Sequence, residues 1–84
     1  MKTYEEMIER GEAHLTKAVN ASTVEAEDRN YYRAEAFCEA IALALDLDEA
    51  AVWEDMKREA EKTMLRKVEG GDSRAKTRWN KFWK

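Results

Sequence analysis

The sequence predicts an all-α fold, a small helical bundle of three long helices plus a short basic C-terminal helix. The 84-residue chain has no proline and only three glycines, so few of its residues interrupt a helix. Hydrophobic residues make up 44% of the chain and charged residues 39%, a balance typical of a helical protein with a water-facing surface. A chain of this length forms one domain, so we expect residues 1–84 to fold as a single helical unit.

The first predicted helix spans about Tyr4 to Val19. Thr3 and Glu6 have the spacing of a capping box at its start. Apolar residues recur along this segment at helical spacing and define one face: Tyr4, Met7, Ile8, Gly11, Leu15, Ala18 and Val19. Glycine in mid-helix costs about 1 kcal/mol relative to alanine. On the apolar face, Gly11 is therefore expected to permit the close approach of a neighbouring helix.

The second predicted helix spans about Thr23 to Leu45, after a break at residues 20–22. Ser22 and Glu25 have the spacing of a second capping box. The apolar face of this helix has seven members: Val24, Tyr31, Ala34, Cys38, Ile41, Ala42 and Leu45. Further apolar residues lie off that face, so we expect this helix to be the central element, contacted from more than one side.

The third predicted helix spans about Glu49 to Val68, after a break at residues 46–48. Asp48 is a favourable N-cap residue for it. Its apolar residues also recur at helical spacing: Val52, Trp53, Met56, Ala60, Met64 and Val68. Gly70 and Gly71 then give the clearest stop signal in the chain, since glycine suits the left-handed position that ends many helices.

The last thirteen residues, 72–84, carry the opposite net charge from the rest of the chain. Five Lys or Arg against one Asp give this segment +4, whereas ten Lys or Arg against seventeen Asp or Glu give residues 1–71 a charge of −7. Asp72 or Ser73 can cap a short helix here. Four apolar residues fall on one face of that helix: Ala75, Trp79, Phe82 and Trp83. The pattern favours a helix packed on the bundle over a free basic arm.

The residue types that catalysis and metal binding need are scarce in this sequence. His14 is the only histidine and has no Cys or His companion at the short spacing of a zinc site. Cys38 is the only cysteine and lies in an apolar helical stretch, which predicts a buried, unreactive thiol. The Gly70–Gly71 pair lacks the surrounding pattern of a phosphate-binding loop. We therefore expect no catalytic residue, no bound metal, no cofactor and no enzymatic activity.

The apolar segments of the chain also bear on its location. No apolar run approaches the roughly 20 residues that span a membrane. The first ten residues lack the apolar core of a signal peptide. A single cysteine is compatible with a reducing compartment. The sequence therefore predicts a cytoplasmic protein without a membrane span.

An acidic surface is the first feature that can carry function. The helical spacing arranges carboxylates in stripes on the first two helices: Glu5, Glu9, Glu12, Asp28, Glu35 and Glu39. Such stripes keep a small protein in solution, and they also fit a protein partner with a basic surface. Phage anti-CRISPR proteins that mimic nucleic acid use the same physics, although here the analogy rests on charge alone. We expect a non-enzymatic protein–protein interaction module, most concretely a small acidic inhibitor or adaptor.

The basic C-terminal segment offers an alternative, nucleic-acid binding. Its cations can contact phosphates while its indole rings stack on bases. The residues concerned are Arg74, Arg78, Lys81, Trp79 and Trp83. A third hypothesis is a homodimer that forms through Tyr32 and Leu43, which lie off the apolar faces, with Trp53 as a further candidate.

Overall fold

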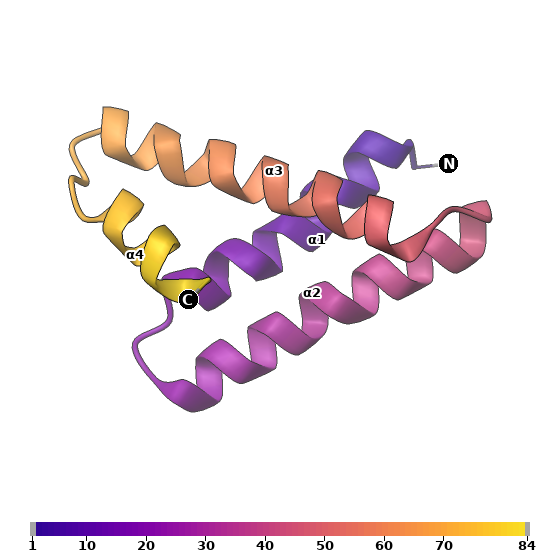
Figure 1. The fold of residues 1–84 in the computed structure, drawn as a ribbon, viewed down its shortest axis with the longest axis horizontal. Coiled ribbons are helices and arrows are strands. Elements are labelled where there is room, and N and C mark those ends of the chain that lie inside the picture. The colour runs from indigo at the N-terminus through magenta and orange to yellow at the C-terminus, as the bar shows by residue number, and fades with distance from the viewer. Residues whose placement is uncertain (1, 84) are drawn as a thin grey trace.

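A computed structural model describes residues 2–83 as four helices in chain order (Figure 1). Their bounds are α1 Tyr4–Val19, α2 Val24–Leu45, α3 Glu49–Glu69 and α4 Ala75–Phe82. This confirms the predicted fold class of three long helices and a short C-terminal one, and residues 2–83 contain no strand. The predicted bounds of the three long helices agree with the observed ones to within one residue. Within this part of the chain, no helix combines the length and the low polarity that crossing a bilayer requires.

The two longest helices, α2 and α3, meet at a tight turn and diverge toward their other ends (Figure 1). The short α4 lies at the open end, beside the last turns of α3. Both α1 and α3 pack against all three other helices, whereas α2 packs mainly against α1 and α3. The expectation that α2 is contacted by more than one helix is confirmed, but α2 is not the central element, because only α1 and α3 contact all three other helices. The outer side of α2, with Tyr32 and Leu43, is exposed, because α4 packs on α3 and α1 instead.

Side-chain caps fix the starts of the first two helices. The hydroxyl oxygen of Thr3 accepts a hydrogen bond from the Glu6 N–H at 3.2 Å, as the capping-box pattern predicts. At the second helix the prediction is wrong by one residue, because Thr23 and not Ser22 is the N-cap. The Thr23 hydroxyl accepts from the Ala26 N–H at 3.1 Å. Serine and threonine are both good caps, so their order in the sequence does not decide between them.

The end of α3 has the hydrogen bonds of a Schellman motif. The Asp72 N–H donates to the Lys67 carbonyl at 2.9 Å, and the Gly71 N–H donates to the Val68 carbonyl at 3.0 Å. Gly71 has a φ of 106°, a conformation that side-chain-bearing residues rarely adopt. The glycine stop signal is thereby confirmed, and it turns the chain back toward α1.

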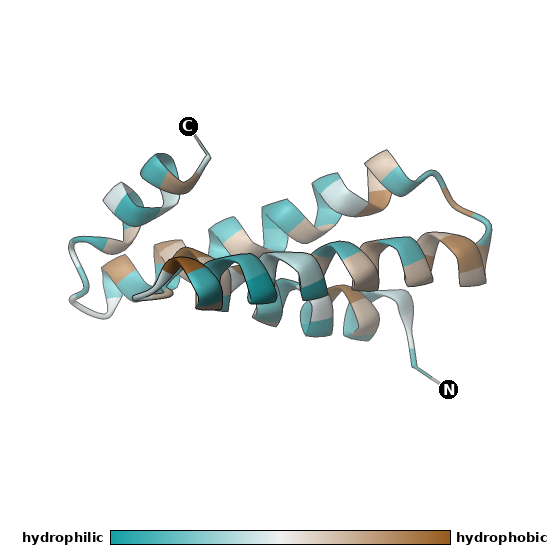
Figure 2. Ribbon diagram, turned by 90° about the horizontal axis from the view of Figure 1, so that it is seen from below, coloured by the Kyte–Doolittle hydropathy of each residue, from teal (hydrophilic) through white to brown (hydrophobic). Residues whose placement is uncertain are grey.

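The core is formed mainly by residues of α1, α2 and α3, and Figure 2 shows apolar residues interspersed with polar ones along these helices. Several of its members are fully enclosed: Leu15, Ala34, Val52, Met56, Ala60 and Met64. Gly11 of α1 faces side chains from both α2 and α3. A Cβ atom at Gly11 would overlap the Met56 side chain and lie 3.3 Å from the Cβ of Phe37. The glycine thus permits the close helix packing that its position in the sequence predicts.

The C-terminal helix is docked on the bundle, as its apolar face predicts. Ala75 is fully buried, and the Trp79 side chain is only 8% exposed. Trp83 joins a cluster of rings from three helices, with its ring centre 5.4 Å from that of Trp79 and 6.3 Å from that of Trp53. Tyr31 closes the cluster from α2, 5.8 Å from the ring of Phe82. These rings join α4 to the N-terminal half of α2 and to the first turns of α3.

Candidate partner-binding groove

A groove of about 500 Å³ lies between α2 and the first turns of α3. Its lining comes from seven residues: Tyr31, Glu35, Cys38, Asp48, Glu49, Ala50 and Trp53. The three residues from α2 lie four and three positions apart, so they face the same way. The residues from α3 include its N-cap, Asp48, and the side chain of Trp53 one turn further on. We call this the α2–α3 groove.

Two aromatic rings form one wall of the α2–α3 groove. The ring centres of Tyr31 and Trp53 lie 5.6 Å apart at an angle of 71°, an edge-to-face arrangement that aromatic pairs favour. Both side chains are half-buried, with Trp53 packed edge-on against Trp83. The rings are therefore held in place from behind while part of their surface remains open to the groove. Trp53 is therefore half-buried beside the groove and does not belong to the exposed surface that the homodimer hypothesis assumes.

Three carboxylates surround the aromatic wall. Glu35, Asp48 and Glu49 are all exposed. The ion pairs found among residues 2–83 involve other side chains, so none of these three has a cationic partner there. Asp48 and Glu49 also lie at the N-terminus of α3, whose helix dipole favours negative charge. The groove thus combines fixed rings with three negative charges that no cation in the described chain neutralises.

Cys38 lines the α2–α3 groove as a buried thiol. Its thiol is buried and donates a hydrogen bond to the Glu49 carbonyl at 3.3 Å. Burial, and then the nearby charges of Glu49, Glu39 and Glu35, raise the pKa of this thiol to about 11. The side chain is therefore a thiol at neutral pH and not a nucleophilic thiolate. This confirms the prediction that Cys38 is a buried residue.

The six predicted acidic residues do not form one surface. Glu5 and Glu9 are exposed on α1 and line a separate hollow of about 390 Å³ beside Asp55 and Arg58. There the Tyr4 hydroxyl donates to Asp55 at 2.6 Å, and burial together with this bond raises the pKa of Tyr4 to about 12. Glu5 and Glu9 therefore border a hollow whose Asp55 is already occupied by Tyr4 and Arg58.

Glu12 is used inside the bundle. Its carboxylate accepts a hydrogen bond from Thr16 at 2.8 Å and another from Thr63 of α3 at 2.5 Å. The side chain is half-buried between α1 and α3, so it differs from the exposed Glu5 and Glu9. The helical spacing of the sequence shows which residues share a face but not which of them meet a polar partner on another helix.

Asp28 and Glu39 lie on the outer side of α2, away from the α2–α3 groove. Asp28 borders a shallow hollow that includes two cations, Arg29 and Arg33. Glu39 borders another hollow that includes Leu43 and Asp46. Of the six predicted residues, only Glu35 belongs to the α2–α3 groove. The remaining groove residues were predicted as structural elements, Asp48 as a cap and Tyr31 and Trp53 as apolar positions.

A sequence signal for the groove does exist. Glu35 follows Tyr31 by four residues on α2, and Trp53 follows Glu49 by four residues on α3, so each carboxylate lies one turn from a ring. The two pairs come together only through the packing of α2 against α3. That packing is a property of the fold, and neither pair is distinctive alone.

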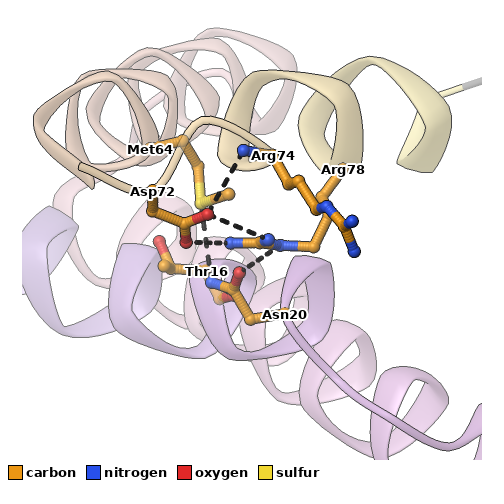
Figure 3. A network of polar contacts seen from close by, with 6 residues as sticks. All are labelled: Thr16, Asn20, Met64, Asp72, Arg74 and Arg78. Carbon is orange, nitrogen blue, oxygen red and sulfur yellow. Dashed lines mark hydrogen bonds and ion pairs between the residues drawn. The ribbon is translucent and has the colours of Figure 1, made fainter. Parts of the chain in front are cut away.

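The cations of α4 are partly used in docking that helix. Arg78 donates to both carboxylate oxygens of Asp72, at 2.6 and 3.4 Å, and its Nε donates to Asn20 Oδ1 at 2.8 Å (Figure 3). Asn20 in turn donates to the Thr16 carbonyl at 2.9 Å. The hydrogen bond from Arg78 holds the pKa of Asp72 below its ordinary value of 3.8. This network joins α4 to the end of α1.

The residues predicted for nucleic-acid binding are thus unequally available. Trp79 is buried, Trp83 is half-buried in the aromatic cluster, and Arg78 is bonded to Asp72. Arg74 and Lys81 are exposed. Lys84, the last residue of the basic segment, lies outside the described residues.

Neither metal-binding geometry in the described residues nor similarity to known proteins indicates a function. In residues 2–83, no group of three or more His, Cys, Asp or Glu side chains is arranged to hold a metal ion. His14 packs on Phe37 with ring centres 5.4 Å apart, and burial lowers the pKa of the imidazole. No family model matches this chain, and comparisons with curated proteins and with solved structures found no similar one.

Proposed function

We propose that this protein is a non-enzymatic interaction module that binds a basic protein partner through the α2–α3 groove. The observation that supports this proposal is the combination of two half-buried aromatic rings with three carboxylates that form no ion pair within residues 2–83. A groove of about 500 Å³ accepts one or two long side chains rather than a folded domain. The occupant is an arginine or lysine side chain that projects from the partner.

Arginine fits this groove better than lysine does. Its planar guanidinium stacks on aromatic rings and donates paired hydrogen bonds to carboxylates, whereas the ammonium of lysine is a compact, strongly hydrated charge. The aromatic cluster already holds one cation, because the Nζ of Lys57 lies 4.6 Å from the centre of the Trp83 ring. A cation over these rings is attracted by about 0.5–2 kcal/mol, depending on how far it is desolvated.

An acidic module of this kind acts as an inhibitor or adaptor. When arginines of the partner occupy the groove, they can no longer bind another anionic ligand. Phosphate groups of nucleic acid are one such ligand, because they are recognised by the same side chains. The proposed activity therefore requires only binding and no bond-making step.

The experiment is a titration of the 15N-labelled protein with a short peptide in which arginines alternate with glycine and serine. We expect the indole resonance of Trp53 and the backbone resonances of Glu35 and Glu49 to shift. A peptide with lysine in place of arginine should bind more weakly, and one with glutamate should produce no shift. Resonance changes spread evenly over all acidic residues would contradict the proposed site.

Charge reversal gives the matched control. The double variant E35K/D48K removes two groove carboxylates, whereas E5K/E9K makes the same change in net charge on α1. We expect the first variant to weaken peptide binding at least tenfold and the second to change it by less than threefold. Equal losses in both variants would show that the peptide responds to total charge and not to the groove. Circular dichroism confirms that each variant remains helical.

The alternative, nucleic-acid binding by α4, is tested in parallel with a single-stranded DNA oligonucleotide. The indole rings that stacking requires are packed within the bundle, and an exposed Arg74 and Lys81 alone give little affinity. We therefore expect no mobility shift even at low salt. A shift that disappears in an R74A/K81A variant would favour the alternative over the acidic groove.

A further inference from the structure

The outer face of α2 is exposed although it carries large apolar side chains. Leu43 is 86% exposed and Tyr32 is 75% exposed, the two highest values among the exposed large hydrophobic residues of the described chain. Two small residues, Ala36 and Ala40, lie between them on the same side of the helix. Shallow hollows at either end of this face meet at Ala36. A helix face with a small-residue centre and large apolar ends favours close packing of another helix.

The two halves of this face differ in net charge. In the N-terminal half, Arg29 and Arg33 lie beside Tyr32 together with one carboxylate, Asp28. In the C-terminal half, Glu39 and Asp46 lie beside Leu43, and the residues that line this hollow include no cation. None of these five charged side chains takes part in the ion pairs formed within residues 2–83. The face therefore has a basic half and an acidic half with apolar residues in both. A surface of this kind is complementary to itself when it is turned end to end.

We propose that two copies of this chain pair through the outer face of α2, with the two helices antiparallel. A two-fold axis midway between positions 37 and 38 places residues whose numbers sum to 75 opposite one another. Tyr32 of each copy then faces Leu43 of the other, and Arg29 faces Asp46. A parallel pair would instead place Arg29 against Arg29 and Asp46 against Asp46, and like charges in contact repel.

The pairing is expected to be reversible. A helix of 22 residues is about 33 Å long at a rise of 1.5 Å per residue, and one helix–helix contact of that length buries less surface than a permanent dimer interface. The proposal does not depend on the α2–α3 groove, because only Glu49 borders both surfaces and it takes no part in the contacts of the proposed register. If the arginine peptide does not bind in the titration, the proposal of a dimer still stands.

Sedimentation velocity over a hundredfold range of protein concentration tests the pairing. We expect the wild-type chain to move from monomer to dimer within that range. L43K should remove the dimer, while L65K, a change at an exposed leucine on α3, should leave it unchanged. A wild-type chain that is monomeric throughout, or equal behaviour of the two variants, would overturn the proposal.

A double-mutant cycle tests the antiparallel register. R29D places an aspartate opposite Asp46 in both symmetric contacts, so we expect dimer affinity to fall at least tenfold. D46N removes an attraction in the wild-type background but a repulsion in the R29D background. Asparagine also tolerates the left-handed φ of 54° at this position. D46N should therefore weaken the wild-type dimer and strengthen the R29D dimer, and an effect of the same sign in both backgrounds would contradict the register.

Discussion

The two ends of the bundle differ in how they use their charges. At the end where α2 turns into α3, Glu35, Asp48 and Glu49 surround a groove and form no ion pair within the described chain. At the other end, where α3 turns into α4, Arg78 is bonded to Asp72 and to Asn20 (Figure 1). The carboxylates at the acidic end therefore remain available to a partner, whereas Arg78 at the basic end is already bonded to residues of the chain itself.

This difference separates stability from binding along one small chain. A charge that already has an internal partner gains little from an external one, because the bond to the first partner must be broken. A charge without a partner keeps its full attraction for an ion of opposite sign. We therefore expect substitutions at the basic end to change mainly stability and those at the acidic end to change mainly binding.

Trp79→Ala should have the largest effect. The substitution empties the site that joins α4 to the bundle, and loss of a buried tryptophan costs about 3–5 kcal/mol. This is a large part of the 5–15 kcal/mol that stabilises an ordinary small domain. Urea denaturation followed by circular dichroism measures the loss. The control is K76A on the exposed side of the same helix, and equal stability of the two variants would mean that α4 contributes nothing to the fold.

Helix positions could be predicted because their signals are local. The absence of proline, the helical spacing of apolar residues and the Gly70–Gly71 stop each act within a few residues of the boundary that they set. The adjacent caps Ser22 and Thr23 mark the limit of this reasoning, since both satisfy the local pattern. Docking of α4 was also predictable from the aromatic residues on its single apolar face.

Contacts between distant residues could not be predicted in the same way. Arg78 meets Asn20 across 58 positions, and Glu12 meets Thr63 across 51. These contacts depend on how the helices cross and rotate, which a helical repeat does not specify. For the same reason, the sequence indicated an acidic surface but did not show that Glu35 shares a groove with Trp53.

Arg78→Met should have the next largest effect, and one that depends on pH. Because Arg78 lowers the pKa of Asp72 in the folded state, the pair stabilises the fold above the unfolded pKa of about 4. This stabilisation is lost as the pH falls through the lower folded pKa. We therefore expect the wild-type chain to melt at a higher temperature than R78M at neutral pH, with the difference narrowing below pH 3.8.

The control for Arg78 is R74M, which removes the same charge from an exposed side chain that forms no ion pair within residues 2–83. Its melting temperature should follow that of the wild-type chain at every pH. A pH-independent difference between R78M and the wild-type chain would mean that Arg78 acts through its packing and its hydrogen bond to Asn20. In that case its bond to Asp72 would contribute nothing.

Glu35→Gln should have the smallest effect on stability. Unlike Trp79→Ala and Arg78→Met, it should stabilise the fold. Glu35 and Glu39 are like charges one turn apart, so neutralising one of them stabilises α2 by a few tenths of a kcal/mol. The control E59Q removes a carboxylate that forms an ion pair with Lys62 at 3.1 Å, and it should cost a similar amount. Urea denaturation at low and high salt measures both changes in stability, and salt should reduce both of them.

If E35Q stabilises the fold while it weakens binding of the arginine peptide, the carboxylate is retained at a cost to stability. A loss of stability in E35Q would instead assign Glu35 a structural role and remove the contrast between the two ends.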